Sequence, residues 1–128
     1  MRVVSRNVRR GMIGVVAGAA LLLAACTGGG GGGGGTTISA KRGGFAFEPS
    51  TITVPVNQPV TITFRNPDSQ AHDWRVRGTG LPEEPVLYAD PGKQETKTFV
   101  FPTAGEFQTY CSLPGHEAAG MVGKLIVR

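Results

Sequence analysis

The chain has 128 residues, and its 13 Lys and Arg against 9 Asp and Glu give a formal net charge of +4. Four of the cations, Arg2, Arg6, Arg9 and Arg10, stand ahead of an apolar run over residues 11–25, and the rest of the chain has as many cations as anions. No basic surplus is left there to displace counterions from phosphates, so we expect no nucleic-acid partner. The length and the 40% content of hydrophobic residues fit one globular domain.

Residues 1–25 have the layout of a secretory signal peptide, with an arginine-rich start, an apolar stretch too short for a transmembrane helix, and small residues at the end. Leu23 to Cys26 resemble a bacterial lipobox, in which cleavage precedes the cysteine and the cysteine carries lipid. An ordinary signal peptide with a chance cysteine is the alternative. Arg9 and Arg10 also resemble a twin-arginine export signal, although Val8 stands where Ser or Thr is usual. We expect an extracytoplasmic lipoprotein, anchored to the cell membrane on its periplasmic or cell-surface side.

A flexible tether is predicted over residues 26–35, where Cys26 and Thr27 are followed by eight glycines. Such a run has no side chains to bury and has maximal backbone freedom. The folded domain is therefore expected to cover residues 36–128.

Alternation of apolar and polar residues predicts β-strands throughout residues 36–128. Val60, Ile62 and Phe64, for example, alternate with threonines, which is the period of a half-buried strand. Pro55 favours an edge position for the strand that contains it. The predicted strands cover residues 37–41, 52–56, 60–64, 72–77, 86–89, 96–101, 106–111 and 122–127. Seven to eight short strands between Asn, Pro and Gly turns, without an amphipathic helix, predict an all-β antiparallel sandwich of two sheets.

Cys111 has no disulfide partner if lipid occupies Cys26, because the chain has only two cysteines. An odd thiol in an oxidising compartment implies intermolecular pairing, deep burial or a metal. A buried small hydrophobe is the ordinary interpretation of a lone cysteine. The surrounding sequence favours a metal instead, since Cys111, His116 and Met121 follow one another with four residues between neighbours.

His72 is the one other histidine of the chain, and its strand can lie beside the Cys111 strand in a sandwich. A thiolate, two imidazoles and a weak thioether make the donor set of a blue-copper site, which accepts both Cu(I) and Cu(II). Zinc accepts the same donors, but a structural zinc site more usually adds Cys or His than a thioether. The sequence therefore favours one copper ion held by His72, Cys111, His116 and Met121.

The stretch from Gly105 to Lys124 resembles the C-terminal signature of the plastocyanin/azurin-like cupredoxins. The quoted matches are residues 45–49, 52–64, 71–73, 105–111 and 120–124. The resemblance implies an eight-stranded Greek-key sandwich, one-electron transfer, and a copper ion with equatorial ligands His72, Cys111 and His116 and axial ligand Met121. Four residues separate Cys111 from His116 where plastocyanin has two, which is closer to the auracyanin and rusticyanin type of loop.

Asp73 stands where this family commonly has Asn directly after its first histidine ligand. An ionised carboxylate can only accept hydrogen bonds. We expect Asp73 to accept them from the Cys111 loop and thereby to tune the site, with a solvated strand-edge carboxylate as the alternative.

Alternation along the strand places Cys111 inward and Tyr110 outward beside it. Tyr110 matches a surface tyrosine that is associated with partner docking in plastocyanins, with an ordinary exposed tyrosine as the alternative. Leu113 and Pro114 flank His116, so one edge of this imidazole is expected within an apolar contact patch.

Two functions follow as expectations from these residues and the resemblance. The first is a membrane-tethered electron carrier between redox partners such as a cytochrome, an oxidase or another membrane-associated donor or acceptor. The second is an extracytoplasmic protein for copper delivery or storage, and a metal-free interaction domain is a weaker third. We expect no enzyme, because hydrolase nucleophile motifs are absent and two histidines cannot also furnish a second, catalytic copper centre.

Overall fold

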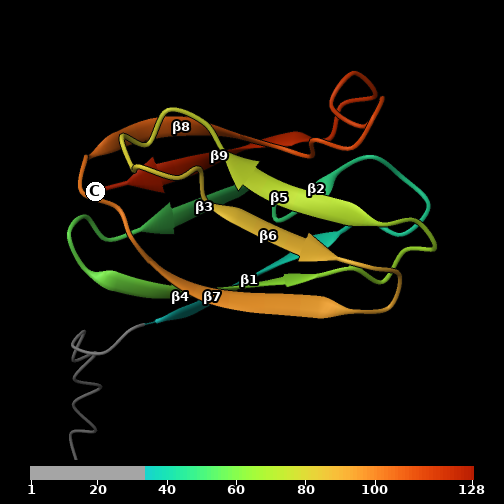
Figure 1. Cartoon of the computed structure of the whole chain (residues 1–128), viewed down its shortest axis with the longest axis horizontal. Coiled ribbons are helices and arrows are strands. Elements are labelled where there is room, and N and C mark those ends of the chain that lie inside the picture. The colour runs from blue at the N-terminus through green and yellow to red at the C-terminus, as the bar shows by residue number, and fades with distance from the viewer. Residues whose placement is uncertain (1–33) are drawn as a thin grey trace, which may run out of the picture. The chain divides into compact units, whose positions relative to one another are not determined.

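The computed structural model of the chain describes residues 34–128 (Figure 1). The predicted signal peptide, Cys26 and the tether up to residue 33 lie outside the described residues. Within residues 34–128, no helix has the length and apolar character needed to cross a membrane. These residues form nine strands. The strands are β1 (Gly35–Ala40), β2 (Phe47–Glu48), β3 (Thr51–Val54), β4 (Pro59–Arg65), β5 (His72–Val76), β6 (Val86–Ala89), β7 (Gln94–Val100), β8 (Gly105–Tyr110) and β9 (Val122–Val127).

The strands form two sheets that pack face to face, which confirms the predicted all-β sandwich (Figure 1). One sheet has the order β2-β1-β4-β7 and the other the order β3-β9-β8-β5-β6. The pairs β1–β4 and β3–β9 are parallel, so the sheets are mixed where antiparallel pairing alone was expected. The reason lies in the connections, since the chain leaves the first sheet after β2 and returns to it with β4. The alternation of apolar and polar residues within one strand does not show where the chain crosses from one sheet to the other.

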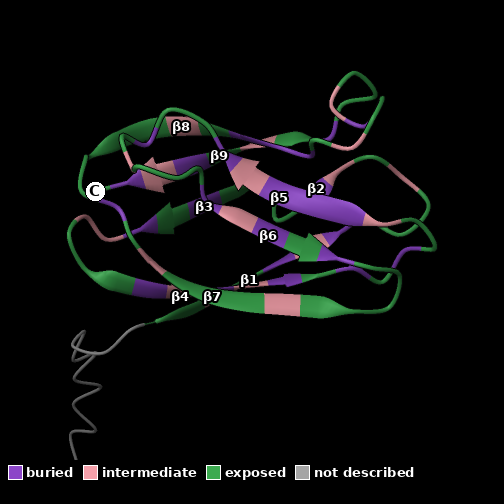
Figure 2. Ribbon diagram, in the orientation of Figure 1, coloured by how far each residue is buried: buried purple, intermediate pink, exposed green. Residues whose placement is uncertain are grey.

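The core lies between the sheets and is built from the inward positions of the alternating strands (Figure 2). Ile62 and Phe64 of β4 are fully buried, and Trp74 of β5 is 1% exposed. Burying a side chain of this size stabilises the folded state by about 1.5–3 kcal/mol. The strand before Pro55, β3, lies at an edge of its sheet, as the proline indicated. The two-residue strand β2 is too short to show a period and was not predicted.

Gly123 in β9 is placed where a side chain would meet the backbone of the loop before β3. A Cβ there would lie 2.3 Å from the carbonyl oxygen of Ser50 and 2.7 Å from Oγ1 of Thr109. Because a backbone carbonyl cannot rotate away like a flexible side chain, we expect Gly123→Ala to lower the free energy of unfolding by about 1–3 kcal/mol. Urea unfolding of the metal-free protein measures this change.

Gly35 in β1 provides the matched control, because a Cβ there would have no atom within 4 Å. We expect Gly35→Ala to leave the unfolding midpoint unchanged or slightly raised, since alanine restricts the unfolded chain. Equal midpoints for the two variants would contradict the close approach at Gly123.

Candidate metal centre

Three side chains with metal-binding atoms converge at one end of the sandwich. His72 is the first residue of β5, Cys111 directly follows β8, and His116 lies in the loop before β9. The Nδ1 atoms of His72 and His116 are 3.1 Å apart, and Sγ of Cys111 is 3.5 Å from Nδ1 of His116. One donor atom from each residue lies within 4.8 Å of the other two. The structure thus brings together three of the four residues named from the sequence through their donor atoms.

The fourth, Met121, is brought to the same place by the backbone of its loop. β8 and β9 pair up to Tyr110 and Val122, which closes the base of the loop. The amide of Cys111 donates to the carbonyl oxygen of Met121 at 3.1 Å, and the amide of Met121 donates to the carbonyl oxygen of His116 at 3.0 Å. The Met121 side chain is fully buried. Its thioether therefore belongs to the interior at this end of the sandwich.

Burial shifts the pKa of two of the donor groups, Cys111 and His116. Cys111 and His72 are fully shielded from solvent, and His116 is 8% exposed. Burial raises the pKa of the Cys111 thiol, an effect that the amide of Asp73, 3.4 Å from Sγ, opposes. Burial, helped by the neighbouring His72, lowers the pKa of His116. A neutral imidazole is the form that binds a metal.

Asp68 orients His72, and sequence reasoning missed this role. Nε2 of His72 lies 2.9 Å from Oδ2 of Asp68, while Oδ1 accepts the amide of Gly43 at 3.0 Å. The hydrogen bond with His72, followed by that from Gly43, lowers the pKa of Asp68 to about 2. An ionised carboxylate can only accept, so Nε2 carries the proton and Nδ1 is left to face the cluster.

Asp73 accepts hydrogen bonds from the Cys111 loop, as expected, and is not a solvated edge residue. The amide and the hydroxyl of Ser112 each donate to its carboxylate at 2.6 Å, and Nε of Arg75 donates at 2.8 Å. Burial alone would raise the pKa of Asp73, but the bonds from Arg75 and Ser112 lower it overall. Asp73 therefore fixes the residue that follows Cys111, while its own amide points at the sulfur.

Tyr110 lies on the outer face of its sheet but is not freely exposed, which corrects the expectation of a surface tyrosine. Only 8% of it is accessible. The guanidinium carbon of Arg77 lies 3.6 Å from the centre of the ring, and the hydroxyl donates to Oε1 of Glu84 at 2.6 Å. Alternation predicts the side of a sheet correctly, but it does not show which neighbouring side chains cover that side.

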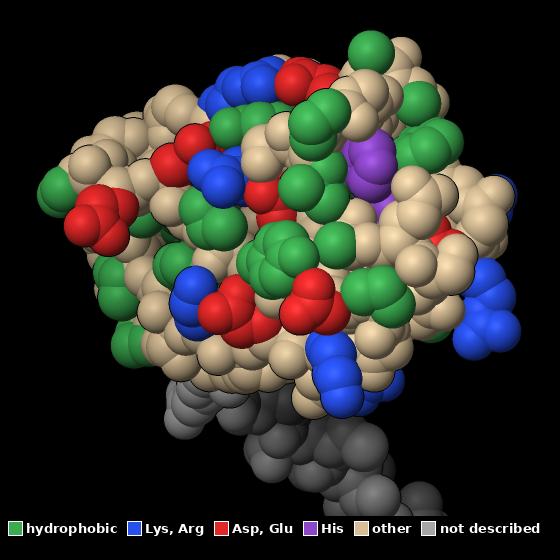
Figure 3. Space-filling view, turned by 45° about the vertical axis from the view of Figure 1, so that its right-hand side comes forward, with side chains coloured by type: hydrophobic (Ala, Val, Ile, Leu, Met, Phe, Trp, Pro, Cys, Tyr) green, Lys and Arg blue, Asp and Glu red, His purple; other side chains and the backbone are tan. Residues whose placement is uncertain are grey.

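An apolar surface surrounds the exposed edge of His116. Histidine reaches the surface among hydrophobic side chains in Figure 3. Pro114 is exposed, Leu113 is partly buried against the core, and Phe45 is 38% exposed with its ring centre 4.8 Å from that of His116. Phe45 was not among the predicted site residues, because it comes from the distant loop between β1 and β2. His116 is therefore the donor with a direct approach from solvent.

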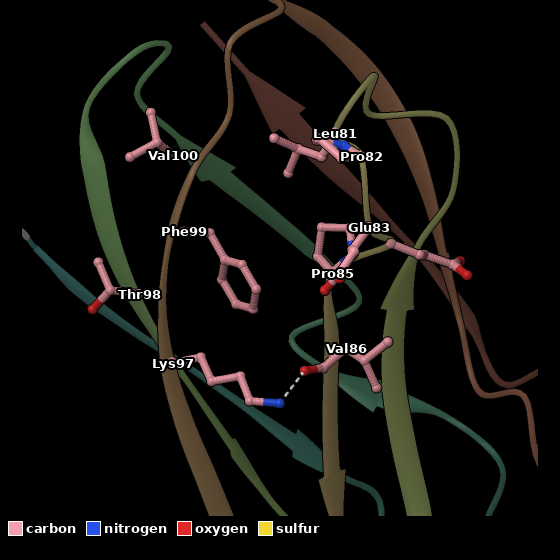
Figure 4. Close-up of a pocket in the computed structure, with 10 residues that line it drawn as sticks. Leu81, Pro82, Glu83, Pro85, Val86, Lys97, Thr98, Phe99 and Val100 are labelled. Carbon is pink, nitrogen blue, oxygen red and sulfur yellow. Dashed lines mark hydrogen bonds between the residues drawn. The ribbon is translucent and has the colours of Figure 1, made fainter.

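A groove lies away from this cluster, between residues 81–86 and β7 (Figure 4). One side chain of β7 joins its walls, since Nζ of Lys97 donates to the carbonyl oxygen of Val86 at 3.0 Å. Outside the groove, Glu95 of β7 accepts the amide of Tyr88 in β6 at 2.6 Å. None of the donor residues lines the groove. The groove thus belongs to the seam between the outer strands β6 and β7 and not to the metal centre.

The donor set fits copper. One thiolate, two imidazoles and a buried thioether suit an ion that changes between Cu(I) and Cu(II), whereas a closed zinc site more usually adds Cys or His. The three donors are already gathered, and the two that are fully buried, His72 and Cys111, each have a hydrogen-bond partner that orients them. Such outer partners raise the affinity of a metal site.

Comparisons with known proteins agree with this interpretation. The model of the cupredoxin-like domain family matches residues 15–127. Plastocyanin of Tetradesmus obliquus is 36% identical over 98 residues, which cover 71% of this chain and 64% of that protein. The copper-resistant cuproprotein CopI of Rubrivivax gelatinosus is 33% identical over 101 residues, which cover 64% of this chain and 59% of that protein. The chain thus spans less than two thirds of the length of these two relatives.

A solved structure gives the same fold. Auracyanin A of Chloroflexus aurantiacus, described as a "blue" copper protein, matches with a TM-score of 0.66 and 26% identity. The match covers 76% of this chain and 100% of that one. Because the family model spans most of its length, the chain belongs to the cupredoxin-like domain family.

Proposed function

We propose that residues 36–128 form a blue-copper domain that carries single electrons between redox partners and is not an enzyme. One observation carries this proposal: donor atoms of His72, Cys111 and His116 lie within 4.8 Å of one another, out of bulk solvent. These three residues, together with the buried Met121, would hold the copper ion. A copper ion held by such a set supplies a one-electron couple between Cu(I) and Cu(II).

The chain holds the donors in place before any electron moves. His72 is fixed on β5 and turned by Asp68, and Cys111 is fixed between β8 and the bonds that join Ser112 to Asp73. Donors that are pre-positioned in this way need little rearrangement between two oxidation states. The arrangement therefore favours a carrier.

His116 offers the short route for the electron, because it is the one histidine donor with an exposed edge. Leu113, Pro114 and Phe45 make the surface around it apolar, and such patches on soluble domains mark contact sites. A redox protein such as a cytochrome, an oxidase or another membrane-associated donor or acceptor would dock here.

An absorption spectrum with a redox titration of the copper-loaded protein tests the proposal. We expect an intense visible band that disappears on reduction and returns fully on oxidation, with one copper ion retained per chain throughout. A copper-loaded protein without such a band would refute the blue-copper assignment, and a band that does not return would refute the carrier.

Copper delivery or storage is the second candidate, favoured by the relative that is named a copper-resistant cuproprotein. The same four side chains would then exchange the metal. Loss of copper to an apo acceptor protein on reduction would favour this function, whereas retention through repeated cycles would favour electron transfer.

We also propose that lipid on Cys26 anchors the protein to the cell membrane, with the glycines that follow as a tether. Cys26→Ser should move the protein from the membrane fraction to the soluble fraction of expressing cells, because a single serine cannot take up the thioether-linked lipid. Cys111→Ser is the matched control and should stay with the membranes. Membrane association of the Cys26→Ser variant at the level of the unaltered protein would count against the anchor.

A further inference from the structure

The outer face of β5 carries a row of charged residues that lie directly behind the metal centre. His72, Trp74 and Val76 point into the core, whereas Asp73 and Arg75 alternate with them, and Arg77 follows the strand in the same alternation. Arg75 is paired with Tyr110, the residue before Cys111. One strand therefore presents a donor on its inner face and ionic groups on its outer face.

Arg77 is held more firmly than an ordinary surface arginine. Its two terminal nitrogens donate to the two carboxylate oxygens of Glu117 at 2.5 and 2.8 Å. The first of them also donates to Oε1 of Gln108 at 3.1 Å, and the guanidinium stacks on Tyr110. The backbone amide of Arg77 donates to the carbonyl oxygen of Gln108 at 3.0 Å. The guanidinium thus has a fixed place on the sheet, from which it binds Glu117 in the loop between β8 and β9.

We propose that Arg77 is a positioning residue of the metal centre, acting through Glu117 to hold His116. Glu117 directly follows His116, just as Ser112, which Asp73 binds, directly follows Cys111. β5 and its continuation would then fix all three clustered donors: His72 by carrying it, and the other two by binding the next residue along the chain. This inference rests on the proposed copper site.

The Arg77–Glu117 pair should stabilise the closed form of the loop and contribute little to the stability of the whole fold. Arg77 and Glu117 are 43% and 39% exposed at their side chains, and exposed ion pairs add little to the free energy of unfolding. The free energy needed to open a loop locally is smaller than the free energy of unfolding the whole protein. A bidentate ion pair in the middle of the loop raises this local opening free energy. Both residues can therefore be changed without unfolding the protein.

The first test uses amide hydrogen exchange in the copper-free protein. Loss of an exposed ion pair changes the population of the opened loop by a factor of about two to five. Arg77→Gln and Glu117→Gln should therefore each raise the amide exchange rate of residues 112–120 by about two- to five-fold. The double variant should be no faster than the single ones. Lys124→Gln and Glu106→Gln break a comparably exposed pair between β8 and β9 and should leave the loop unchanged. Unchanged loop exchange in the Arg77 and Glu117 variants, or additive effects, would overturn the proposal.

The second test measures the rate at which the copper-loaded protein loses Cu(I) to a coloured chelator. Arg77→Gln should release the ion about two to five times faster and shift the visible band of the oxidised form. Arg77→Lys keeps the charge but cannot bind both oxygens or stack in the same way, so it should behave like Arg77→Gln. Rescue by lysine to the rate of the unaltered protein would show that charge matters and not position, and would overturn the proposal. If the unaltered protein binds no copper, the proposed function fails, while the exchange test still decides whether Arg77 holds the loop.

Discussion

Replacement of Cys111 by serine should abolish the intense visible absorption of the copper-loaded protein. The band of a blue-copper site comes from charge transfer between the thiolate and Cu(II), and a serine hydroxyl at neutral pH is neither ionised nor soft. Cys111 is fully buried with its sulfur 3.5 Å from Nδ1 of His116, so no other sulfur can take its place from solvent. A spectrum of the oxidised protein before and after the change gives the result.

Cys26→Ser is the control for this prediction, because it removes the other cysteine of the chain. It should leave the band unchanged. Thermal unfolding of the copper-free Cys111→Ser protein should show a cooperative transition, which separates loss of the ligand from loss of the fold. A band that survives in folded Cys111→Ser protein would contradict the assignment of the thiolate as a ligand.

Removal of the carboxylate of Asp68 should weaken copper binding by about 10- to 100-fold, the usual effect of losing the outer partner of a ligating histidine. In Asp68→Ala, Nε2 of His72 loses its acceptor at 2.9 Å and the ring loses the bond that turns Nδ1 toward the other donors. The amide of Gly43 loses its acceptor as well. Competition with a chelator of known affinity measures the change.

Asp68→Asn separates orientation from charge, because the amide oxygen still accepts from Nε2 and the shape is retained. Its loss of affinity should be clearly smaller than that of Asp68→Ala. Asp90→Ala changes an exposed aspartate whose contact is the Tyr88 hydroxyl and should leave the affinity unaltered. Affinity of Asp68→Ala equal to that of the unaltered protein would show that packing alone fixes the ring of His72.

Most of the fold was predictable because each long strand repeats its period over several residues. Val60, Ile62 and Phe64 form the inner side of β4 as the alternation indicated. The parallel pairing of β1 with β4 was not predictable, since it depends on where the chain exchanges sheets. Strand β2 has two residues and shows no period.

The donors of the metal centre were predictable from residue type, because Cys, His and Met are rare in this chain and their chemistry is narrow. The residues that orient these donors were harder to predict from the sequence. Asp68 and Glu117 are ordinary acidic residues in the sequence, and their partners, His72 and Arg77, become visible only when the loops are folded. Asp73 was the exception, because it directly follows a donor.

The seam between β6 and β7 has a consequence for self-association. An outer strand with free amide and carbonyl groups is a template on which a second molecule can extend the sheet. On β6 two of these groups, the amide of Tyr88 and the carbonyl of Val86, are already bonded to Glu95 and Lys97. A neighbouring copy would have to break both contacts before it could add a strand there. These two contacts therefore lower the tendency of the protein to aggregate through the β6 edge at high concentration.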